Sequence, residues 1–346
     1  MKIGIIARAD NTGLGNQSLN LCKMLKPDKV MVVDSTPFNK NKQHFNWYQD
    51  FDHIVTSGWP TIADCREFTN GLTHIFSAET MYNNEIYNLS SINNIKTYLH
   101  TNYEFFDQLV DTKMPSPYYC VMPSYWKNTE VKKLFKRVEY LPPPIFMNEF
   151  KSSRDKNLSR KNNKRRYLHM VGKRAINDRN GTLDLIKALQ YSASDFELVI
   201  KSQHELSDII TNDKRITFDT NDIKNVNEMY EDFDAMILPR RYGGLCLPMN
   251  EALACGLPVI MTDTSPNNEI LPDEFLVKSE KREQFMARTM IQTYSVEHKI
   301  LASIIDNISE MSTNEINNMK VKAVDLAYSN FSSDVLKNKY EELFKI

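Results

Sequence analysis

Residues 238–263 read LPRRYGGLCLPMNEALACGLPVIMTD, and this stretch decides the fold class. The apolar run at 235–238 predicts a buried strand, which ends at Pro239. A turn with two glycines follows and leads into a helix that we expect to end at Gly256, a favoured residue just beyond a helix. Residues 258–261 (PVIM) then predict the next strand. Strand, helix and strand in this order indicate an α/β protein with a parallel sheet.

The turn within this stretch is a candidate phosphate-binding site. Gly243 and Gly244 let a ligand approach the backbone closely, and N–H groups at the start of a helix attract phosphate. Ligands of open α/β sheets bind beyond the carboxyl ends of the strands, where this turn lies. We expect these two glycines and Leu245 to bind a phosphorylated ligand. Arg240 and Arg241 precede the turn, either as a solvated pair or as a further phosphate contact or acceptor clamp.

Strand and helix patterns alternate on both sides of residues 142–166. This alternation predicts two parallel sheets with helices on both faces, and therefore two Rossmann-like domains. A length of 346 residues agrees with two domains of roughly 150 residues each. The predicted strands of the first half are at 2–7, 29–33, 53–56, 73–77, 96–100, 118–122 and 138–141, and those of the second half at 167–171, 196–201, 216–218, 235–238 and 258–261.

Three consecutive prolines, Pro142 to Pro144, stop regular structure between the two halves. The basic segment that follows at 151–166, KSSRDKNLSRKNNKRR, has no apolar period, so we interpret this region as an interdomain linker. The predicted organisation is an N-terminal domain at 1–142, a basic linker at 143–166, a C-terminal domain at 167–328 and a final helical segment at 329–346.

Residues 238–263 resemble the signature of the retaining GT-B glycosyltransferases related to sucrose and glycogen synthases and to mannosyltransferases (glycosyl transferases group 1). That signature has Pro-Ser, then Glu-Gly-Phe-Gly-Leu, a second Glu, and Ala-x-Ala-x-Gly-x-Pro-Val. Glu251 matches the second Glu, which in the family holds the ribose hydroxyls of the donor. The residues that match the end of the signature are Ala252, Ala254, Gly256, Pro258 and Val259.

The resemblance departs at the first Glu of the signature. Gly243 stands at that position, eight residues before Glu251. In the family this Glu lies near the transferred sugar, so its loss leaves the donor sugar open. A site without those acceptor oxygens discriminates less between sugars, which favours a relaxed or unusual donor choice. Asn250 is the alternative, as a polar side chain that replaces the missing Glu.

A second match is at 169–188, HMVGKRAINDRNGTLDLIKA. It resembles the family's strand and Gly-Arg turn, followed by Lys-Gly and a helix, in which the Arg and Lys neutralise the donor diphosphate in place of a metal ion. Lys173 takes the Arg position, and Arg179 sits beside the Lys position, which is Asn180 here. Cations at these points stabilise the charge that develops on the leaving diphosphate. Lys173 and Arg179 are therefore candidate catalytic and donor-binding residues, and ordinary loop cations are the alternative.

The family also implies how the domains are used. GT-B enzymes have two Rossmann-like domains that face each other across a cleft, with an N-terminal acceptor domain and a C-terminal nucleotide-sugar domain. Their last helix crosses back to the N-terminal domain, and an apolar stripe at helical spacing suits this role. The residues of that stripe are Phe331, Leu336, Tyr340 and Leu343.

The first strand is followed by a Gly-x-Gly turn at Gly13 and Gly15. This pair is weak evidence for a dinucleotide, because the third glycine of that fingerprint is replaced by Ser18. In GT-B enzymes the equivalent loop touches donor phosphate or acceptor, so both glycines are candidate donor contacts.

Two further candidates end strands of the first half. His100 matches a family position at which a His contacts the donor sugar, and we carry it as a catalytic candidate. A structural histidine is an equal alternative. Glu79 could face the acceptor or serve only as a carboxylate at a helix start.

Composition excludes several other classes. The chain is 41% hydrophobic and 25% charged with a net charge of −1, which is globular rather than polyanion-binding overall. Five cysteines lack a Cys-x-x-Cys pair, so neither disulfides nor a zinc site is predicted. No apolar run approaches the roughly 20 residues of a membrane span, and no signal-peptide pattern is present. We therefore expect a cytoplasmic protein without a metal site.

The leading hypothesis is a metal-independent retaining glycosyltransferase that uses a UDP- or GDP-sugar, needs no other cofactor and acts on an unidentified acceptor. A phage-type enzyme acting on DNA bases is one alternative, because the basic segment could follow a phosphate backbone. An inverting transferase or an epimerase is another. A catalytically silent GT-B-like binding protein is the last, and the missing Glu is its main support.

Overall fold

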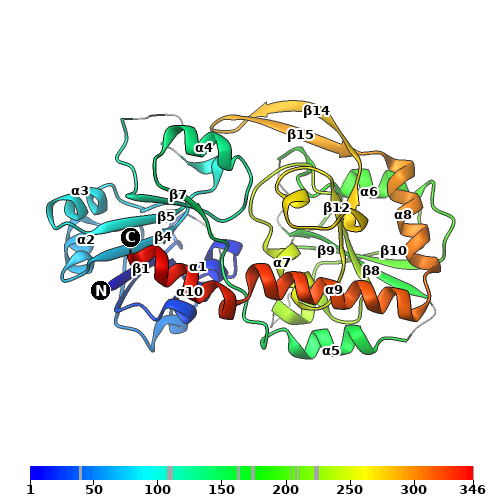
Figure 1. Cartoon of the computed structure of the whole chain (residues 1–346), viewed down its shortest axis with the longest axis horizontal. Coiled ribbons are helices and arrows are strands. Elements are labelled where there is room, and N and C mark those ends of the chain that lie inside the picture. The colour runs from blue at the N-terminus through cyan, green and yellow to red at the C-terminus, as the bar shows by residue number, and fades with distance from the viewer. Residues whose placement is uncertain are drawn as a thin grey trace. The chain divides into compact units, whose positions relative to one another are not determined.

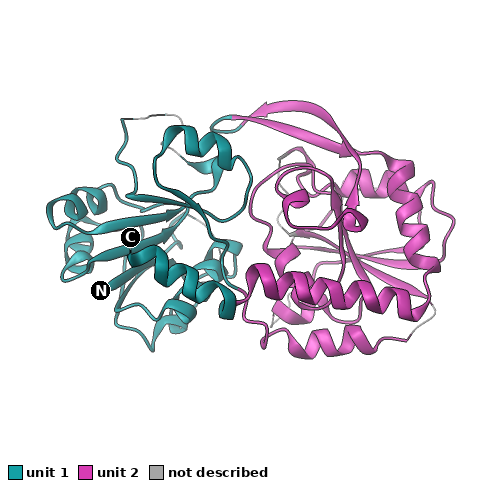
Figure 2. Cartoon of the chain, viewed as in Figure 1, with its two compact units in different colours: residues 1–144, 287–289, 333–346 teal, residues 145–286, 290–332 magenta. Residues whose placement is uncertain are grey.

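The computed structural model describes residues 1–38, 41–106, 111, 113–161, 164–172, 176–203, 205–206, 209, 211–221 and 226–345 (Figure 1). The chain forms two compact units (Figure 2). Unit 1 comprises Met1–Pro144, Ala287–Thr289 and Ser333–Ile346, and unit 2 comprises Ile145–Met286 and Met290–Ser332. Each unit has its own parallel sheet, so the predicted α/β class is confirmed.

The sheet of unit 1 has seven parallel strands in the order β3-β2-β1-β4-β5-β6-β7. Its five central strands are almost entirely buried, as expected for a sheet covered on both faces, whereas the two edge strands are partly exposed. The strands are β1 (Ile3–Arg8), β2 (Lys29–Val33), β3 (His53–Val55), β4 (His74–Ala78), β5 (Lys96–His100), β6 (Tyr119–Met122) and β7 (Val138–Tyr140). The helices are α1 (Gly13–Leu25), α2 (Ile62–Thr69), α3 (Glu85–Ile92), α4 (Asn128–Leu134) and α10 (Ser333–Lys345).

The last helix, α10, belongs to unit 1 because its apolar stripe is buried there. The ring of Phe344 meets that of Tyr98 edge-on at a centroid distance of 5.0 Å, and the Tyr340 hydroxyl donates to the carbonyl of Pro142 at 3.0 Å. Phe331, which the sequence placed on the same helix, instead ends the preceding helix and packs in the core of unit 2. The helix that joins unit 1 starts at Ser333, within the predicted segment at 329–346.

The sheet of unit 2 has six parallel strands in the order β10-β9-β8-β11-β12-β13. A separate antiparallel hairpin of β14 and β15 follows it, which the sequence reading did not predict. The strands are β8 (Arg165–Gly172), β9 (Phe196–Ser202), β10 (Ile216–Asp219), β11 (Ala235–Leu238), β12 (Val259–Thr262), β13 (Leu276–Val277), β14 (Ser279–Met286) and β15 (Met290–Val296). The helices are α5 (Lys151–Ser159), α6 (Thr182–Leu189), α7 (Leu247–Ala254), α8 (His298–Glu310) and α9 (Thr313–Phe331).

Short 3-10 helices complete the described elements, at Phe45–Tyr48, Tyr103–Phe105, Ile176–Asp178, Val226–Tyr230, Asn267–Glu269 and Asp273–Phe275. In unit 2 the direction of strand order reverses between β8 and β11. In open α/β sheets such a reversal marks the crevice where ligands bind, outside the carboxyl ends of the strands. The loops that follow β8 and β11 therefore border the expected ligand-binding crevice of unit 2.

The segment predicted as a basic linker is instead part of unit 2. Helix α5 packs through polar side chains, which explains why no apolar period was visible. The Asn157 amide is buried and donates to the carbonyls of Tyr230 and Cys255 at 2.8 and 2.9 Å. Ser153 donates to the carbonyl of Asn227 at 3.0 Å.

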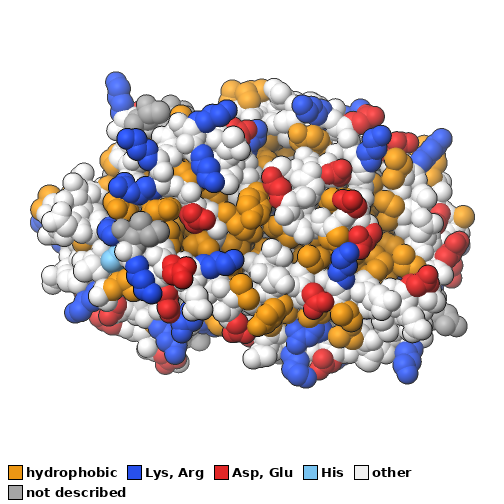
Figure 3. Space-filling model, in the orientation of Figure 1, with side chains coloured by type: hydrophobic (Ala, Val, Ile, Leu, Met, Phe, Trp, Pro, Cys, Tyr) orange, Lys and Arg blue, Asp and Glu red, His pale blue; other side chains and the backbone are white. Residues whose placement is uncertain are grey.

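The cations of this segment are largely neutralised within unit 2. Ion pairs join Lys151 to Asp155, Lys156 to Glu231, Arg160 to Asp232 and Asp234, Lys164 to Asp195, and Arg166 to Glu197 and Asp232. The fold therefore gives no support to the idea that this segment follows a nucleic-acid backbone. Acidic and basic side chains are also interspersed on the face shown in Figure 3.

A buried ion cluster connects α5 to α9. Asp234 is fully buried and accepts from Arg160 at 2.7 Å and from Lys320 at 3.0 Å. Burial lowers the pKa of Lys320, although the Asp234 charge opposes that shift. Two cations thus share one buried carboxylate in the interior of unit 2, and Arg160 pairs with Asp232 as well.

No described helix combines the length and the apolar character needed to cross a membrane. All five cysteines are buried and unpaired, in agreement with the predicted absence of disulfides.

Candidate active site

The turn between β11 and α7 wraps around a single buried side chain, that of Arg240. Its guanidinium donates to the carbonyl oxygens of Tyr242 at 3.1 Å, Leu245 at 3.1 Å and Gly244 at 3.4 Å. The side chain is only 4% exposed and forms no ion pair with any described residue. The sequence predicted Arg240 to be either a solvated cation or a ligand contact. It did not predict that the guanidinium binds the backbone carbonyls of the turn.

The opposite side of this turn presents backbone donors. The N–H groups of residues 243–247 donate no hydrogen bond to any residue that the structure describes. Each N–H of a trans peptide points away from the carbonyl of the same peptide plane. Because the carbonyls of residues 242, 244 and 245 face Arg240, the N–H groups of Gly243, Leu245 and Cys246 face away from it. Successive unbonded N–H groups of this kind form a concave anion-binding nest.

The turn after β8 is pressed against the turn after β11. A Cβ atom on Gly181 would lie 2.0 Å from the carbonyl oxygen of Pro239, so only glycine permits this approach. The two turns are also joined by a hydrogen bond of 2.8 Å from the N–H of Arg241 to the carbonyl of Arg179. The two sequence motifs, separated by about 60 residues, therefore meet at one edge of the sheet.

Arg179 lies beside the nest. Its guanidinium carbon is 5.0 Å from the centre of the Tyr242 ring, which is a cation–π distance. The adjacent Asn180 is not a substitute cation, because its amide donates to the carbonyls of Met170 and Val171 at 3.0 Å. Lys173, the other predicted cation, lies outside the described residues.

Arg241 does not face the nest. Its guanidinium donates to the carbonyls of Asn177 at 2.8 Å and Tyr294 at 3.1 Å, and pairs with Glu283 at 2.6 Å. These contacts fix the β14–β15 hairpin to the turn after β8. The donor-binding role of Arg241 stays a prediction, and its guanidinium is already bonded to partners within unit 2.

Glu251 projects from α7 into the interior beside this site. Its Oε2 accepts a hydrogen bond of 2.5 Å from the Tyr230 hydroxyl, and its Oε1 accepts none from a described residue. Burial raises the pKa of Glu251 to about 7, and the hydrogen bond from Tyr230 only partly opposes the rise. The carboxyl group thus has one oxygen held by the protein and one that can accept from a ligand.

Asn250, the residue before Glu251, is 1% exposed, and neither atom of its amide has a partner among the described residues. A buried amide without a partner is rare, because leaving it unsatisfied costs about 1–3 kcal/mol. Its surroundings agree with the hypothesis that this side chain serves a ligand.

His169 and Asp178 make the edge of the sheet rigid. The His169 ring spans the carbonyl of Ile237 at 2.7 Å and the Thr182 hydroxyl at 2.9 Å, and burial lowers its pKa to about 4. Asp178 accepts from the N–H groups of Thr182 and Leu183 at 3.1 and 2.8 Å. The neutral imidazole and the capping carboxylate therefore hold α6 against β8 and β11.

The glycine turn of unit 1 has a different construction. A Cβ atom on Gly15 would lie 1.9 Å from the carbonyl oxygen of Asp10, so this glycine allows the tight passage from β1 to α1. Thr12 caps α1 by accepting from the N–H of Gly15 at 3.3 Å. These contacts involve only the Gly15 backbone and its steric surroundings, and the predicted donor role of Gly13 and Gly15 stays a prediction.

His100 is a structural histidine in this fold. Its ring is fully buried, with Nδ1 at 2.5 Å from the Gln17 amide and Nε2 at 3.0 Å from the carbonyl of Leu141 and 2.8 Å from the Tyr340 hydroxyl. Burial lowers the pKa of His100 to about 3, so the ring is neutral. The donor-sugar contact of His100 stays a prediction, and the burial of the ring and its protein partners favour the structural alternative.

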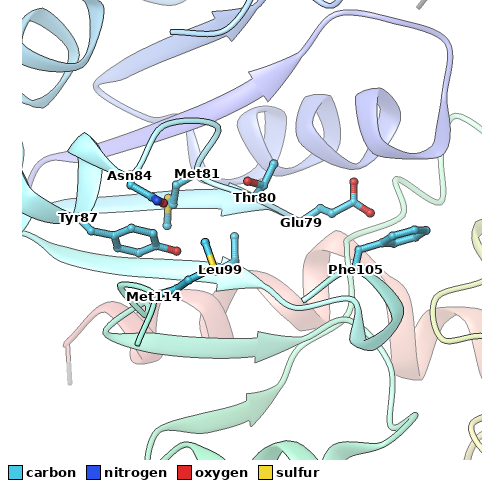
Figure 4. Close-up of a pocket in the computed structure, with 8 residues that line it drawn as sticks. All are labelled: Glu79, Thr80, Met81, Asn84, Tyr87, Leu99, Phe105 and Met114. Carbon is cyan, nitrogen blue, oxygen red and sulfur yellow. The ribbon is translucent and has the colours of Figure 1, made fainter. Parts of the chain in front are cut away.

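Glu79 follows β4 at a positive φ of 68° and receives a weak hydrogen bond of 3.5 Å from Asn102. Burial raises its pKa. It borders a cavity of about 30 Å³, room for roughly one water molecule and not for a sugar. The cavity is drawn in Figure 4, and its lining residues are Glu79, Thr80, Met81, Asn84, Tyr87, Leu99, Phe105 and Met114.

Among the described residues, no group of three or more His, Cys, Asp or Glu side chains is placed to hold a metal ion. The anion nest, Arg179 and Glu251 are therefore the groups of unit 2 on which a donor site can be built.

Comparison with known proteins agrees with this arrangement. Residues 165–295 match the model of the family described as glycosyl transferases group 1. No curated protein matches the chain in sequence.

Solved structures match over the whole chain. Anabaena HepE in complex with UDP and glucose aligns with a TM-score of 0.70 at 12% identity, and covers 100% of this chain and 99% of its own. A glycosyltransferase from Rickettsia africae aligns with a TM-score of 0.71 at 15% identity, over 99% and 98%. Sucrose-phosphate synthase from Thermosynechococcus elongatus aligns with a TM-score of 0.68 at 12% identity, over 100% and 98%. Residues 165–295 therefore match a glycosyl transferases group 1 domain, and the chain as a whole has the GT-B fold of these glycosyltransferases.

Proposed function

We propose that this protein transfers a sugar from a nucleoside-diphosphate sugar to an acceptor, with retention of the anomeric configuration and without a metal ion. The observation that carries the proposal is the row of unbonded N–H groups at residues 243–247, beside Arg179 and Glu251. The N–H groups and Arg179 can donate hydrogen bonds to an anion, and the Glu251 carboxylate can accept them from a pair of hydroxyl groups. A nucleoside diphosphate carries both, as its diphosphate and its ribose.

The diphosphate would lie against the nest. Its oxygens accept hydrogen bonds from the N–H groups at the start of α7, where the helix dipole also favours negative charge. Arg179 adds a positive charge from the neighbouring turn. By resemblance to the family, Lys173 is proposed to add a second one. These groups take over the neutralising role that a metal ion has in other transferases.

Glu251 would bind the ribose. Its Oε1 can accept from a ribose hydroxyl while Tyr230 continues to hold Oε2. The nucleotide named with Anabaena HepE is UDP, which supports a uridine donor as the first to test.

The reaction breaks the bond between the anomeric carbon and the diphosphate oxygen, and both electrons of that bond leave with the diphosphate. Groups already placed around the diphosphate lower the barrier, because they need no reorganisation as its charge increases. The acceptor hydroxyl then bonds to the anomeric carbon and loses its proton. Retention is proposed from the resemblance of residues 238–263 to retaining enzymes.

Calorimetric titration with UDP and GDP in the presence of EDTA tests this proposal. We expect UDP to bind without metal, and Glu251→Ala to weaken that binding by about 1.5–3 kcal/mol, because hydrogen bonds to a charged acceptor are lost. Glu274→Ala is the matched control, since Glu274 is a half-exposed carboxylate paired with Lys322 in the same unit. Equal affinities for the wild type and Glu251→Ala would contradict the assignment.

Turnover separates an enzyme from a silent binding protein. Release of UDP from UDP-glucose and related donors, with and without candidate acceptors, should be measured in the same buffer with EDTA. Nucleotide binding without any release of UDP would favour the catalytically silent alternative. Activity that is lost in EDTA and restored by a divalent cation would contradict the metal-free proposal.

A further inference from the structure

The guanidinium of Arg240 occupies the space that a side chain at position 243 would need. A Cβ atom on Gly243 would lie 2.6 Å from Nη2 and 3.3 Å from Cζ of Arg240. The φ angle of Gly243 is +115°, which other residues rarely adopt. The guanidinium therefore fills the volume into which any side chain at position 243 would project.

The Arg240 side chain is a buried cation that pairs with no carboxylate in the described part of the chain. Arg240 is 4% exposed, and its described partners are the carbonyls of Tyr242, Gly244 and Leu245. Carbonyl oxygens satisfy its N–H groups but do not neutralise its charge. A buried charge is expensive unless an opposite charge compensates it. An anion bound on the other face of the same turn would supply that compensation.

The planar fork of Arg240 also sets the direction of the peptides. Three carbonyls can converge on one guanidinium because it presents five N–H donors in a fixed plane. Each carbonyl that is drawn inward turns the following N–H outward, toward the nest. A lysine has the same charge, but its compact ammonium does not fix three peptides in this way.

We propose that Arg240 is a positioning residue for the donor diphosphate: it holds the turn so that the N–H groups of residues 243–247 face the phosphates, and it supplies the positive charge beneath them. This inference rests on the proposed function, since it concerns the same nucleotide site. It also explains why position 243 is glycine rather than the glutamate of the family signature, because a side chain there would displace the guanidinium.

The test compares UDP with uridine, which lacks the phosphates. Both ligands should be titrated calorimetrically against the wild type, Arg240→Lys and Arg240→Met. We expect both variants to lose at least ten-fold in affinity for UDP and less than two-fold for uridine. A variant that merely folds poorly would lose both ligands together, so the ratio of the two affinities reports on positioning.

Gly243→Ala provides a second variant with an intact arginine. It places a methyl group against Nη2, and we expect it to reduce UDP affinity as Arg240→Met does. Because both changes act on one contact, the double variant should be no worse than the more severe single one. Gly71→Ala is the matched control, since Gly71 has a positive φ of 76° and nothing within 4 Å of the added carbon. It should leave UDP affinity unchanged.

Hydrogen exchange of the amides at 243–247 gives an independent readout. In the wild type UDP should slow the exchange of these amides, and in Arg240→Met the protection should be lost. Wild-type affinity for UDP in Arg240→Lys, or unchanged protection in Arg240→Met, would overturn this inference and leave the proposed function standing. Failure of the wild-type protein to bind UDP at all would overturn both.

Discussion

The turn after β1 in unit 1 and the turn after β11 in unit 2 both connect a buried strand to a helix through glycines, but their electrostatics differ. In unit 1, Arg8 is paired with the buried carboxylate of Asp10, which also accepts from the hydroxyls of Thr12 and Ser35. In unit 2, Arg240 has only carbonyl partners among the described residues.

The difference supports our proposal that the turn after β11 binds the donor diphosphate. The first turn is neutralised by its own side chains, and Thr12 caps the helix that follows. The second leaves a cation and a row of N–H groups without an internal anion. A glycine pattern alone could not distinguish them, because both turns require glycine, Gly15 against the carbonyl of Asp10 and Gly243 against the guanidinium of Arg240.

The largest expected effect is on the free energy of unfolding, when the carboxylate shared by two buried cations of unit 2 is removed. Asp234→Asn would leave Lys320 and Arg160 without their shared anion, and we expect the free energy of unfolding to fall by about 3–5 kcal/mol. Urea denaturation followed by circular dichroism measures the change. Asp155→Asn, which removes a more than half-exposed partner of Lys151, is the control and should lower the free energy of unfolding far less than Asp234→Asn does. If Asp234→Asn and Asp155→Asn lowered the free energy of unfolding by similar amounts, the buried ion pairs would be no more important for stability than the exposed one.

The next effect concerns Glu251, the acidic member of the proposed site. Its folded-state pKa of about 7 lies above the usual 4.5, so the folded protein holds this proton more tightly than the unfolded chain does. The protonated Glu251 therefore contributes up to about 3 kcal/mol to the free energy of unfolding. This contribution is complete below pH 4.5 and is lost as the pH rises through 7. Glu251→Gln cannot ionise. We therefore expect the stability of the wild type relative to Glu251→Gln to fall between pH 5 and pH 8 in urea titrations, and a constant difference would contradict this pKa.

A pair of alanine substitutions tests the comparison of the two turns directly. Gly15→Ala and Gly181→Ala each force a Cβ to about 2 Å from a carbonyl oxygen, so each should destabilise its unit by roughly 1–3 kcal/mol. Only Gly181→Ala should also weaken UDP binding, because Gly181 presses the turn of Arg179 against that of Arg240. Thermal denaturation and UDP titration measure the two properties. Equal loss of UDP binding in both variants would remove the distinction between the turns.

The smallest effect is expected at Asn250. If its unpartnered amide serves the transferred sugar in place of the missing glutamate, Asn250→Leu should weaken a nucleotide sugar relative to UDP by about 1 kcal/mol. Stability should not fall, because the replacement removes a buried amide that has no described partner. Titration with UDP, UDP-glucose and a UDP-pentose gives the comparison. A strong preference for one common hexose that Asn250→Leu does not alter would contradict both a relaxed donor choice and a role for Asn250.

The sequence by itself determined the two parallel sheets and all of their strands except β13, the glycine turn after β11 and the position of Glu251 on α7. These features follow from apolar periodicity, from glycine and proline at the ends of elements, and from spacing within one motif. All of these act over a few residues, so they can be read along the chain.

Only the tertiary structure decided what the polar side chains do. His100 is bound by Tyr340, 240 residues away, and Arg241 is held by Glu283 on a hairpin that the sequence did not reveal. Helix α5 has almost no apolar face, so its place in unit 2 became visible only through the buried contacts of Asn157. Arg240 and Arg241 are adjacent and chemically identical, yet one is turned beneath the nest and the other toward the hairpin. The physical reason is that a charged group takes its role from partners that only the folded chain brings within hydrogen-bonding distance.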